Sequence, residues 1–442
     1  MRAPSLISQA VFSMRWEQVV EFAAKTDVGM RRQNNEDTCA AHLAREEQVF
    51  RDRGHLFVVA DGMGGHAVGE LASKLAADMV PHSFLKSNGG NVQKAMRSAV
   101  ENANSTINAR GSQNRDFQRM GTTCSALALS AKGAVIGHVG DSRVYRVRRD
   151  RIDQLTFDHS LQWELERRGR LKPEDISLQE HRNVITRSLG PEPQVEVDVE
   201  GPIPVFADDV FVLCSDGLTA HVTDGEIATI VRDLPPKAAC RMLVNLANLR
   251  GGTDNCTVIV IRIGQLPSNV TTASVEVPVP VRNTLSWKWL LWFWLFGVGL
   301  VCGTTLTLAK YFVPGLSIFG VSALGGIVMS LFAWKESYQI RTALPDDAME
   351  PGNGVPYRSH VARPVKDLLS ELASLAVELQ RTAKEDGWSV DWKTYEDSVA
   401  KSREALSQKR RSQALREYGK AIDALMNGLI EERRATTGTS LT

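Results

Sequence analysis

The sequence predicts an α/β-type or α+β domain of catalytic size over residues 21–264. The prediction rests on short runs of Val, Ile and Leu that are typical of strands, and on segments between them with apolar residues at helical spacing. The strand-like runs are Leu56–Ala60, Ala134–Val139, Val210–Cys214 and Cys256–Ile263. The helix-like segments are Gly69–Val80, Val92–Ile107 and Leu161–Arg168. Residues 1–20 form an amino-terminal extension to this domain.

The composition is that of an ordinary globular protein. The chain has 442 residues, with 52 Lys and Arg against 51 Asp and Glu, a formal net charge of +1 and 23% charged residues. This balance disfavours a nucleic-acid-binding protein, which usually carries a basic surface. The six cysteines are scattered, without the spacing of zinc ligands, so we expect most of them to be small buried residues in a reducing compartment.

One segment departs from this average. Between Trp289 and Trp334 the only charged side chain is Lys310. The run divides into two apolar stretches of about 20 residues, each long enough to cross a bilayer as a helix. Tryptophans gather at its outer ends, as interfacial aromatic residues do. The sequence therefore predicts two transmembrane helices over residues 285–335, with a buried helical hairpin as the alternative.

Charges that flank this segment predict its orientation. Arg282 and Lys288 precede it, and Lys335 and Arg341 follow it. Because positively charged flanks stay on the cytoplasmic side, both ends of the pair are expected there. The protein is thus predicted to lie in the cell's inner or plasma membrane, with its catalytic domain and carboxyl terminus in the cytoplasm.

Two linkers and a helical region complete the predicted organisation. Residues 265–284 and 343–364 contain Pro and lack helical periodicity, which is typical of linkers. In residues 365–434 apolar side chains recur on helical faces, which predicts a small helical bundle or hairpin. Two roles stay open for it, namely binding a protein partner or self-association, and simply capping the membrane anchor.

Acidic residues stand beside the predicted strands. Four aspartates lie within two residues of a strand-like run: Asp61, Asp141, Asp216 and Asp254. A single Asp-Gly pair usually does no more than turn the chain. Four such aspartates in one domain, with the acidic pair Glu36 and Asp37, indicate a cluster of carboxylates.

Such a cluster needs a cation, because burying an uncompensated carboxylate costs several kcal/mol. Oxygen ligands without thiolates or paired histidines favour Mg²⁺ or Mn²⁺ over Zn²⁺. Two such ions bridged by a carboxylate can activate water for displacement at phosphorus. Gly62 would allow the backbone to approach one of them, since it has no side chain to obstruct the ion.

Eight segments resemble, in order, the motif set of the metal-dependent serine/threonine protein phosphatases of the protein phosphatase 2C family in its bacterial form. They are TDVGMRRQNNED (Thr26–Asp37), DGMGGHAVGELAS (Asp61–Ser73), MGTTCSAL (Met120–Leu127), GDSRVY (Gly140–Tyr145), DHSL (Asp158–Leu161), ITRSLG (Ile185–Gly190), CSDGL (Cys214–Leu218) and GGTDNCT (Gly251–Thr257). The resemblance implies a two-sheet β-sandwich flanked by helices, with the metal centre at one end. It implies nothing about residues after 264.

The resemblance also implies metal ligands. Asp61 would bridge two Mn²⁺ or Mg²⁺ ions. Asp216 and Asp254 would complete the ligands of the first ion, and Glu36 with the carbonyl group of Gly62 would help to hold the second.

The remaining roles follow from the same resemblance. Asp37 would act through water, and Asp141 with Asp216 would form a weaker third metal site. Arg32 would grip the substrate phosphate, for which its planar guanidinium is suited. His66 would be the general acid that protonates the departing serine or threonine oxygen, since an imidazole can supply a proton near neutral pH.

The leading functional prediction is a membrane-anchored phosphatase that hydrolyses phosphoserine and phosphothreonine in proteins and opposes a serine/threonine kinase of the same cell. The alternative is a signalling adaptor that binds a phosphoprotein without turnover. Aspartyl-phosphate chemistry with Asp61 as nucleophile is a third hypothesis. It usually needs a second acid two residues later, where this chain has Met63.

Overall fold

The structure is a computed structural model that describes residues 20–65, 67–87, 91–117, 120–167, 184–264, 287–342 and 356–437. The chain divides into two compact units. One unit comprises Met1–Ser274 together with Pro351–Thr442, and the other is Val275–Glu350.

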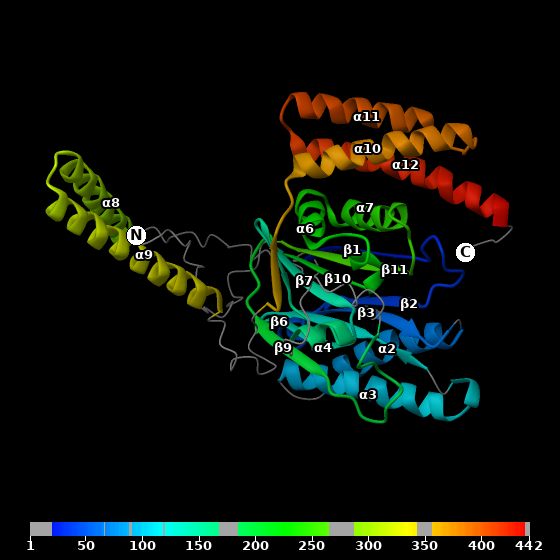
Figure 1. Cartoon of the computed structure of the whole chain (residues 1–442). Helices are drawn as coiled ribbons and strands as arrows, with labels where there is room; N and C mark the ends of the chain where they lie inside the picture. The colour runs from blue at the N-terminus through cyan, green and yellow to red at the C-terminus, as the bar shows by residue number, and fades with distance from the viewer. Residues whose placement is uncertain are drawn as a thin grey trace, which may run out of the picture. The chain divides into compact units, whose positions relative to one another are not determined.

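Two antiparallel sheets form the centre of the first unit (Figure 1). The first sheet has the order β1 (Val20–Asp27), β11 (Cys256–Ile263), β10 (Val210–Cys214), β7 (Arg143–Arg148), β8 (Arg151–Gln154) and β12 (Arg358–Val361). The second has the order β2 (Asp37–His42), β3 (His55–Met63), β5 (Cys124–Ser130), β6 (Gly133–Val139) and β9 (Asp198–Ile203), with β4 (Gly121–Thr122) beside β3.

Helices cover the outer faces of both sheets. The second sheet packs against α2 (Ala67–Lys86) and α3 (Val92–Ser112). The first packs against α6 (Asp224–Asp233) and α7 (Pro236–Leu249). Shorter helices lie in the described connections, namely α1 (Glu47–Asp52), η2 (Arg115–Phe117), α4 (Leu161–Arg167) and α5 (Asp216–Thr219). The predicted α+β sandwich flanked by helices is therefore confirmed.

The central strands are apolar along their whole length because both of their faces are buried. In β3, Phe57 and Val59 belong to the core between the two sheets, whereas Leu56 and Val58 belong to the core beneath α2 and α3. A strand buried on both sides loses the polar and apolar alternation of a surface strand. This explains why continuous runs of Val, Ile and Leu marked the strands in the sequence.

The second unit contains a helical pair, α8 (Trp287–Leu308) and α9 (Phe312–Thr342), which contact each other. The turn between them carries Lys310 in a left-handed conformation, with φ of 70°. In the part of the chain that the structure describes, no helix combines the length and apolarity that a membrane crossing requires. The predicted transmembrane hairpin is therefore not supported.

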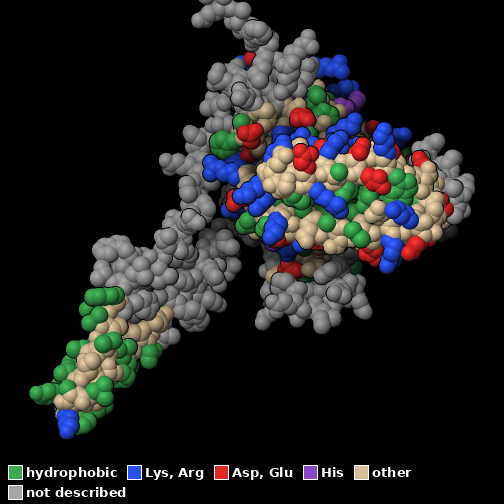
Figure 2. All heavy atoms as spheres, turned by 90° about the horizontal axis from the view of Figure 1, so that it is seen from above, with side chains coloured by type: hydrophobic (Ala, Val, Ile, Leu, Met, Phe, Trp, Pro, Cys, Tyr) green, Lys and Arg blue, Asp and Glu red, His purple; other side chains and the backbone are tan. Residues whose placement is uncertain are grey.

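The carboxyl-terminal region belongs to the first unit. Within the segment 343–364, which the sequence predicted as a linker, β12 pairs with β8 and extends the first sheet. Beyond it lie α10 (Val365–Glu385), α11 (Trp392–Ser407) and α12 (Arg411–Thr437). Their apolar faces share one buried core with α6 and α7. Figure 2 looks down on these helices, and their outer surface shows positive and negative side chains interspersed.

An ionic network joins these helices to the helices that cover the first sheet. Glu226, whose side chain is only 1% exposed, accepts hydrogen bonds from Arg250 and from Arg363. Both arginines also bind Glu371 on α10. The carboxylate of Glu226 is thus shared between the two parts of the unit, and this environment lowers its pKa to about 2, through hydrogen bonds from Arg250 and Thr223 that outweigh the effect of burial.

We expect Glu226→Ala to lower the free energy of unfolding by about 3 kcal/mol, because it leaves two arginines without their shared buried partner. Urea unfolding of the full chain measures this, with Glu101→Ala at an exposed position of α3 as the matched control. A loss no larger than that of the control would show that the network contributes little to stability.

Candidate metal and phosphate site

Five aspartates lie at strand ends of the sandwich. Asp37 and Asp61 face each other as paired residues of β2 and β3. Asp216 begins α5 immediately after β10, and Asp254 stands just before β11. Asp141 follows the end of β6. The structure brings these residues, which are spread over more than 200 positions of sequence, close enough for each to influence the charge of another.

Burial and mutual repulsion disfavour the charged forms of Asp61 and Asp216. The pKa of Asp61 lies well above its usual value, first because the side chain is buried and then because Asp37, Asp216, Asp141 and Asp254 add negative charge. Burial, with the charge of Asp254, also raises the pKa of Asp216 to about 6. Carboxylates with raised pKa values at one position are typical of a functional site or of a cation site.

Asp37 and Asp141 show the same effect. Burial raises the pKa of Asp37 to about 7, although hydrogen bonds from Ser215 and Thr257 act in the opposite direction. Burial and then the charges of Asp216 and Asp158 raise the pKa of Asp141 to about 8. Compensation for this concentrated negative charge must come from protons or from cations.

Two buried carboxylate oxygens lack hydrogen-bond partners among the described residues, namely Oδ1 of Asp37 and Oδ1 of Asp141. Buried polar atoms are nearly always paired, so an orphaned oxygen in an acidic cluster fits a ligand to a cation or to ordered water. Among the described residues no group of three or more His, Cys, Asp or Glu side chains is arranged so that it could hold a metal ion as it stands. The residue types and the orphaned oxygens fit hard divalent ions, which prefer oxygen ligands.

Glycines bring Glu36 and the backbone of Gly62 together. The amide of Gly62 donates to the carbonyl oxygen of Glu36 at 3.1 Å. A Cβ atom on Gly62 would lie 2.1 Å from the carbonyl oxygen of Gly69, and one on Gly69 would lie 2.0 Å from Oε2 of Glu36. The absence of side chains at both glycines therefore allows the Glu36 carboxylate to lie beside the first turn of α2.

Arg32 lies at the edge of the acidic cluster. Its Nη2 donates to Oδ2 of Asp254 at 2.7 Å, and its side chain is 52% exposed. The charges of Asp254, Glu36 and Asp61 outweigh its partial burial and raise its pKa. The guanidinium thus stays positive and is accessible to an anion that approaches the aspartates from solvent.

The residues next to the acids fix the backbone that carries them. The Thr123 hydroxyl accepts from the amide of Asp61 at 2.9 Å, and the Thr122 hydroxyl donates to the carbonyl oxygen of Asp61 at 2.9 Å. Asn255 accepts from the amide of Glu36 at 2.8 Å and donates to the carbonyl groups of Val28 and Asn34. These contacts tie the loop of residues 28–36 to the strand that follows Asp254.

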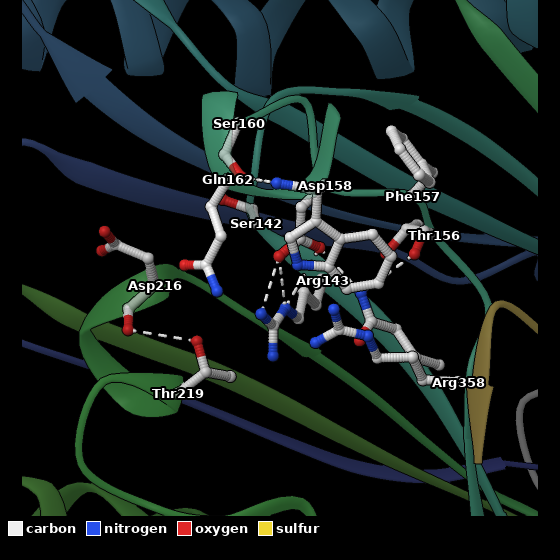
Figure 3. A network of polar contacts seen from close by, with 12 residues as sticks. Ser142, Arg143, Thr156, Phe157, Asp158, Ser160, Gln162, Asp216, Thr219 and Arg358 are labelled. Carbon is white, nitrogen blue, oxygen red and sulfur yellow. Dashed lines mark hydrogen bonds and ion pairs between the residues drawn. The ribbon is translucent and has the colours of Figure 1, made fainter. Parts of the chain in front are cut away.

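Arg143 is a site residue for which the sequence predicted no role. It is paired with Asp158 at 2.7 Å and donates from Nη1 to the Tyr145 hydroxyl at 2.9 Å. Its charge opposes the raised pKa values of Asp141 and Asp216. Figure 3 shows its guanidinium beside Asp158, with Asp216 nearby and Arg358 reaching in from β12. An arginine at the first position of a strand, two residues after Asp141, is the sequence signal that could have identified it.

His159, in the DHSL segment, braces the loop that carries Asp141. Its Nδ1 accepts from the amide of Gly140 at 3.0 Å, and its Nε2 lies 2.9 Å from Asp198. The predicted general acid, His66, lies outside the described residues, so its role stays a prediction.

Comparisons with known proteins find one family. Residues 24–256 match the family model described as protein phosphatase 2C. Protein phosphatase PhpP of Streptococcus pneumoniae is 33% identical over 250 residues, 56% of this chain and 98% of that protein. Serine/threonine phosphatase stp of Listeria innocua is 34% identical over 244 residues, 54% of this chain and 93% of that protein. The crystal structure of the Mycobacterium tuberculosis serine/threonine phosphatase PstP/Ppp is 33% identical, with a TM-score of 0.50, and the match covers 56% of this chain and 100% of that one.

Proposed function

We propose, from the premise that this chain belongs to the protein phosphatase 2C family, that its first unit hydrolyses phosphoserine and phosphothreonine in proteins at the aspartate cluster around Asp61. The chain is a serine/threonine protein phosphatase, like the relatives described above. The observation that carries the proposed mechanism is the meeting of five aspartates, two of them with orphaned buried oxygens, beside the exposed Arg32.

The family is metal-dependent, and the donor set here suits Mn²⁺ or Mg²⁺. Asp61 would help to hold two such ions. Asp216 and Asp254 would hold one ion, and Glu36 with the carbonyl group of Gly62 would hold the other. When bound, such ions would lower the pKa of water and neutralise charge on the phosphoryl group.

Two further acids would act around this pair. Asp37 would contribute through water, because its Oδ2 is engaged by the Ser215 hydroxyl at 2.7 Å while its Oδ1 is orphaned. Asp141 would hold a weaker third ion together with Asp216.

Arg32 would bind and orient the substrate. Its guanidinium offers two parallel N–H donors to two phosphate oxygens, which fixes the phosphoryl group in one orientation. The ion pair with Asp254 holds the guanidinium at the cluster before substrate arrives. With Asp254 holding a cation, more of the guanidinium's charge would be available to phosphate.

We expect His66→Ala to slow the hydrolysis of phosphothreonine peptides by about 100-fold while slowing p-nitrophenyl phosphate far less, because an aryl oxide leaves without a proton and an alkoxide does not. Steady-state kinetics on the two substrates with the same enzyme preparation measure this. Equal losses on both substrates would remove His66 from the general-acid role.

The substrate assignment is tested with the full chain and Mn²⁺, by measuring phosphate release from peptides that differ only in phosphothreonine or phosphotyrosine. We expect release from the phosphothreonine peptide, inhibited by EDTA. A folded chain that binds Mn²⁺ and the peptide without turnover would favour the non-catalytic adaptor, which the phosphatase relatives do not favour.

The proposed cellular role is to oppose a serine/threonine kinase of the same cell. Phosphoproteomes of a deletion strain and the wild type would identify the substrates, and an unchanged phosphoproteome would contradict this role. The membrane location and its cytoplasmic orientation stay predictions, for which fractionation with protease protection is the test. Self-association through the carboxyl-terminal helices also stays a prediction, although their apolar faces are used within the first unit.

A further inference from the structure

The last turns of α12 reach the loop that carries Arg32. Nη1 of Arg433 donates to the carbonyl oxygen of Gly29 at 2.8 Å, and the same nitrogen lies 3.7 Å from the Met30 sulfur. In Figure 1, α12 runs along the helical layer above the sandwich toward the side where the loop after β1 lies. Arg433 is far beyond residue 256, where the family match ends.

Contacts with α7 hold α12 in place. Leu415, Ile422 and Leu425 are buried in the core that the two helices share. Asp423 accepts a hydrogen bond from Asn245 at 2.7 Å and lies 3.3 Å from Nε of Arg241. Arg433 therefore extends from a packed helix, which limits how far its guanidinium can move relative to the carbonyl group of Gly29 that it binds.

The turn that Arg433 contacts is packed against the turn that carries Asp254. The amides of Met30 and Arg31 both donate to the carbonyl oxygen of Gly252, at 2.8 and 3.1 Å. Gly29 has φ of 80°, and a Cβ atom on it would lie 2.2 Å from the carbonyl oxygen of Asp254. Any displacement of this turn therefore changes the position of the residue that follows it, Arg32.

Arg32 depends on this backbone for its position. Its side chain is half-exposed, and the hydrogen bond to Asp254 comes from a single nitrogen. A long, half-exposed side chain has many rotamers, so its average position follows the backbone that carries it. A phosphate that must be bound by two donors at once is sensitive to small displacements of that backbone.

We propose that Arg433 is a positioning residue for phosphate binding. It fixes the turn of Gly29–Arg31 from its outer side, and through this turn it holds Arg32 in the orientation that receives the substrate phosphate. The carboxyl-terminal helices thereby set the affinity of the site for phosphorylated substrates. The inference rests on the proposed role of Arg32.

The first test compares Arg433→Ala and Arg433→Lys in the full chain. For a phosphothreonine peptide we expect Arg433→Ala to raise KM, and the inhibition constant of inorganic phosphate, by about 5-fold, with kcat changed less than about 2-fold. Lysine should restore much of this loss, because its ammonium group can still donate to one carbonyl oxygen. Arg416→Ala, at an exposed position of the same helix, is the matched control and should leave both constants unchanged.

A double-mutant cycle separates positioning from a general structural effect. Arg32→Ala alone should raise KM, and Arg433→Ala should then add less than about 2-fold, because residues that act through one another are not additive. The same 5-fold increase on both backgrounds would overturn the inference, as would a fall in kcat at unchanged KM.

The cycle also distinguishes this inference from the proposed function. An unchanged KM in Arg433→Ala, with a raised KM in Arg32→Ala, would overturn only the role of Arg433. An unchanged KM and phosphate inhibition constant in Arg32→Ala would overturn the phosphate-binding role of Arg32 and the inference with it.

Discussion

Replacing Asp61 with asparagine is expected to abolish phosphatase activity while raising the melting temperature of the metal-free protein. Activity should fall by about 10³-fold or more, since in the proposed mechanism Asp61 would help to hold the ions that supply several kcal/mol of transition-state stabilisation. Stability without metal should rise, because Asp61 is buried among four other acids and the amide removes one negative charge from that cluster.

The opposite directions of the two effects make this test sharp. Phosphate release with Mn²⁺ measures the first effect, and thermal unfolding in EDTA measures the second. Glu101→Gln, at an exposed position of α3, removes one negative charge elsewhere and should change neither quantity. Activity near the wild-type level in Asp61→Asn would contradict the bridging role, and a lower melting temperature would show that the variant damages the fold.

Removal of metal is expected to make stability depend on pH in a defined direction. In the metal-free protein burial raises the pKa of Asp216 to about 6, of Asp37 to about 7 and of Asp141 to about 8. In the unfolded chain each of these aspartates has a pKa of about 4. Between about pH 4 and pH 8 the folded state therefore holds more protons, so its stability falls as the pH rises.

Bound Mn²⁺ should oppose this loss, because cations and protons compete for the same carboxylates. We expect EDTA-treated protein to melt at a lower temperature at pH 8 than at pH 5.5, and Mn²⁺ to raise the melting temperature more at pH 8. Thermal unfolding at both pH values, with and without Mn²⁺, measures this, and phosphatase activity should return with the metal. An equal effect of Mn²⁺ at both pH values would indicate that these acids do not bind it, and recovery of activity with Zn²⁺ alone would contradict the assignment of hard oxygen ligands.

Local patterns predicted much of the sandwich. The runs Leu56–Ala60 and Val210–Cys214 became parts of β3 and β10, and Val92–Ile107 became part of α3, because burial on both faces of a strand or on one face of a helix leaves a pattern in neighbouring residues. The acidic cluster was also predictable, since Asp61 and Asp216 each stand at the end of an apolar run and are each followed by glycine.

The membrane hairpin shows the limit of this reasoning. Low charge between Trp289 and Trp334 predicted two spans, and the structure forms helices there. Among the residues it describes, however, none of the helices meets the requirement for crossing a membrane. The apolar faces of α10 and α12 show the same limit in another form, because periodicity reveals that a face will be buried but does not reveal which surface covers it.

The amino-acid sequence alone determines the type of chemistry. Carboxylates at strand ends, with an arginine and no thiolate cluster, favour a hard cation and suit a phosphate once the fold brings them together. Only the tertiary structure decided that β12 extends the first sheet, that Arg143 lies against the acidic cluster and that Arg433 binds Gly29, 404 positions earlier. The physical reason is that a hydrogen bond between distant residues imposes no periodicity on the residues beside either partner, so it becomes visible only when the fold places them in contact.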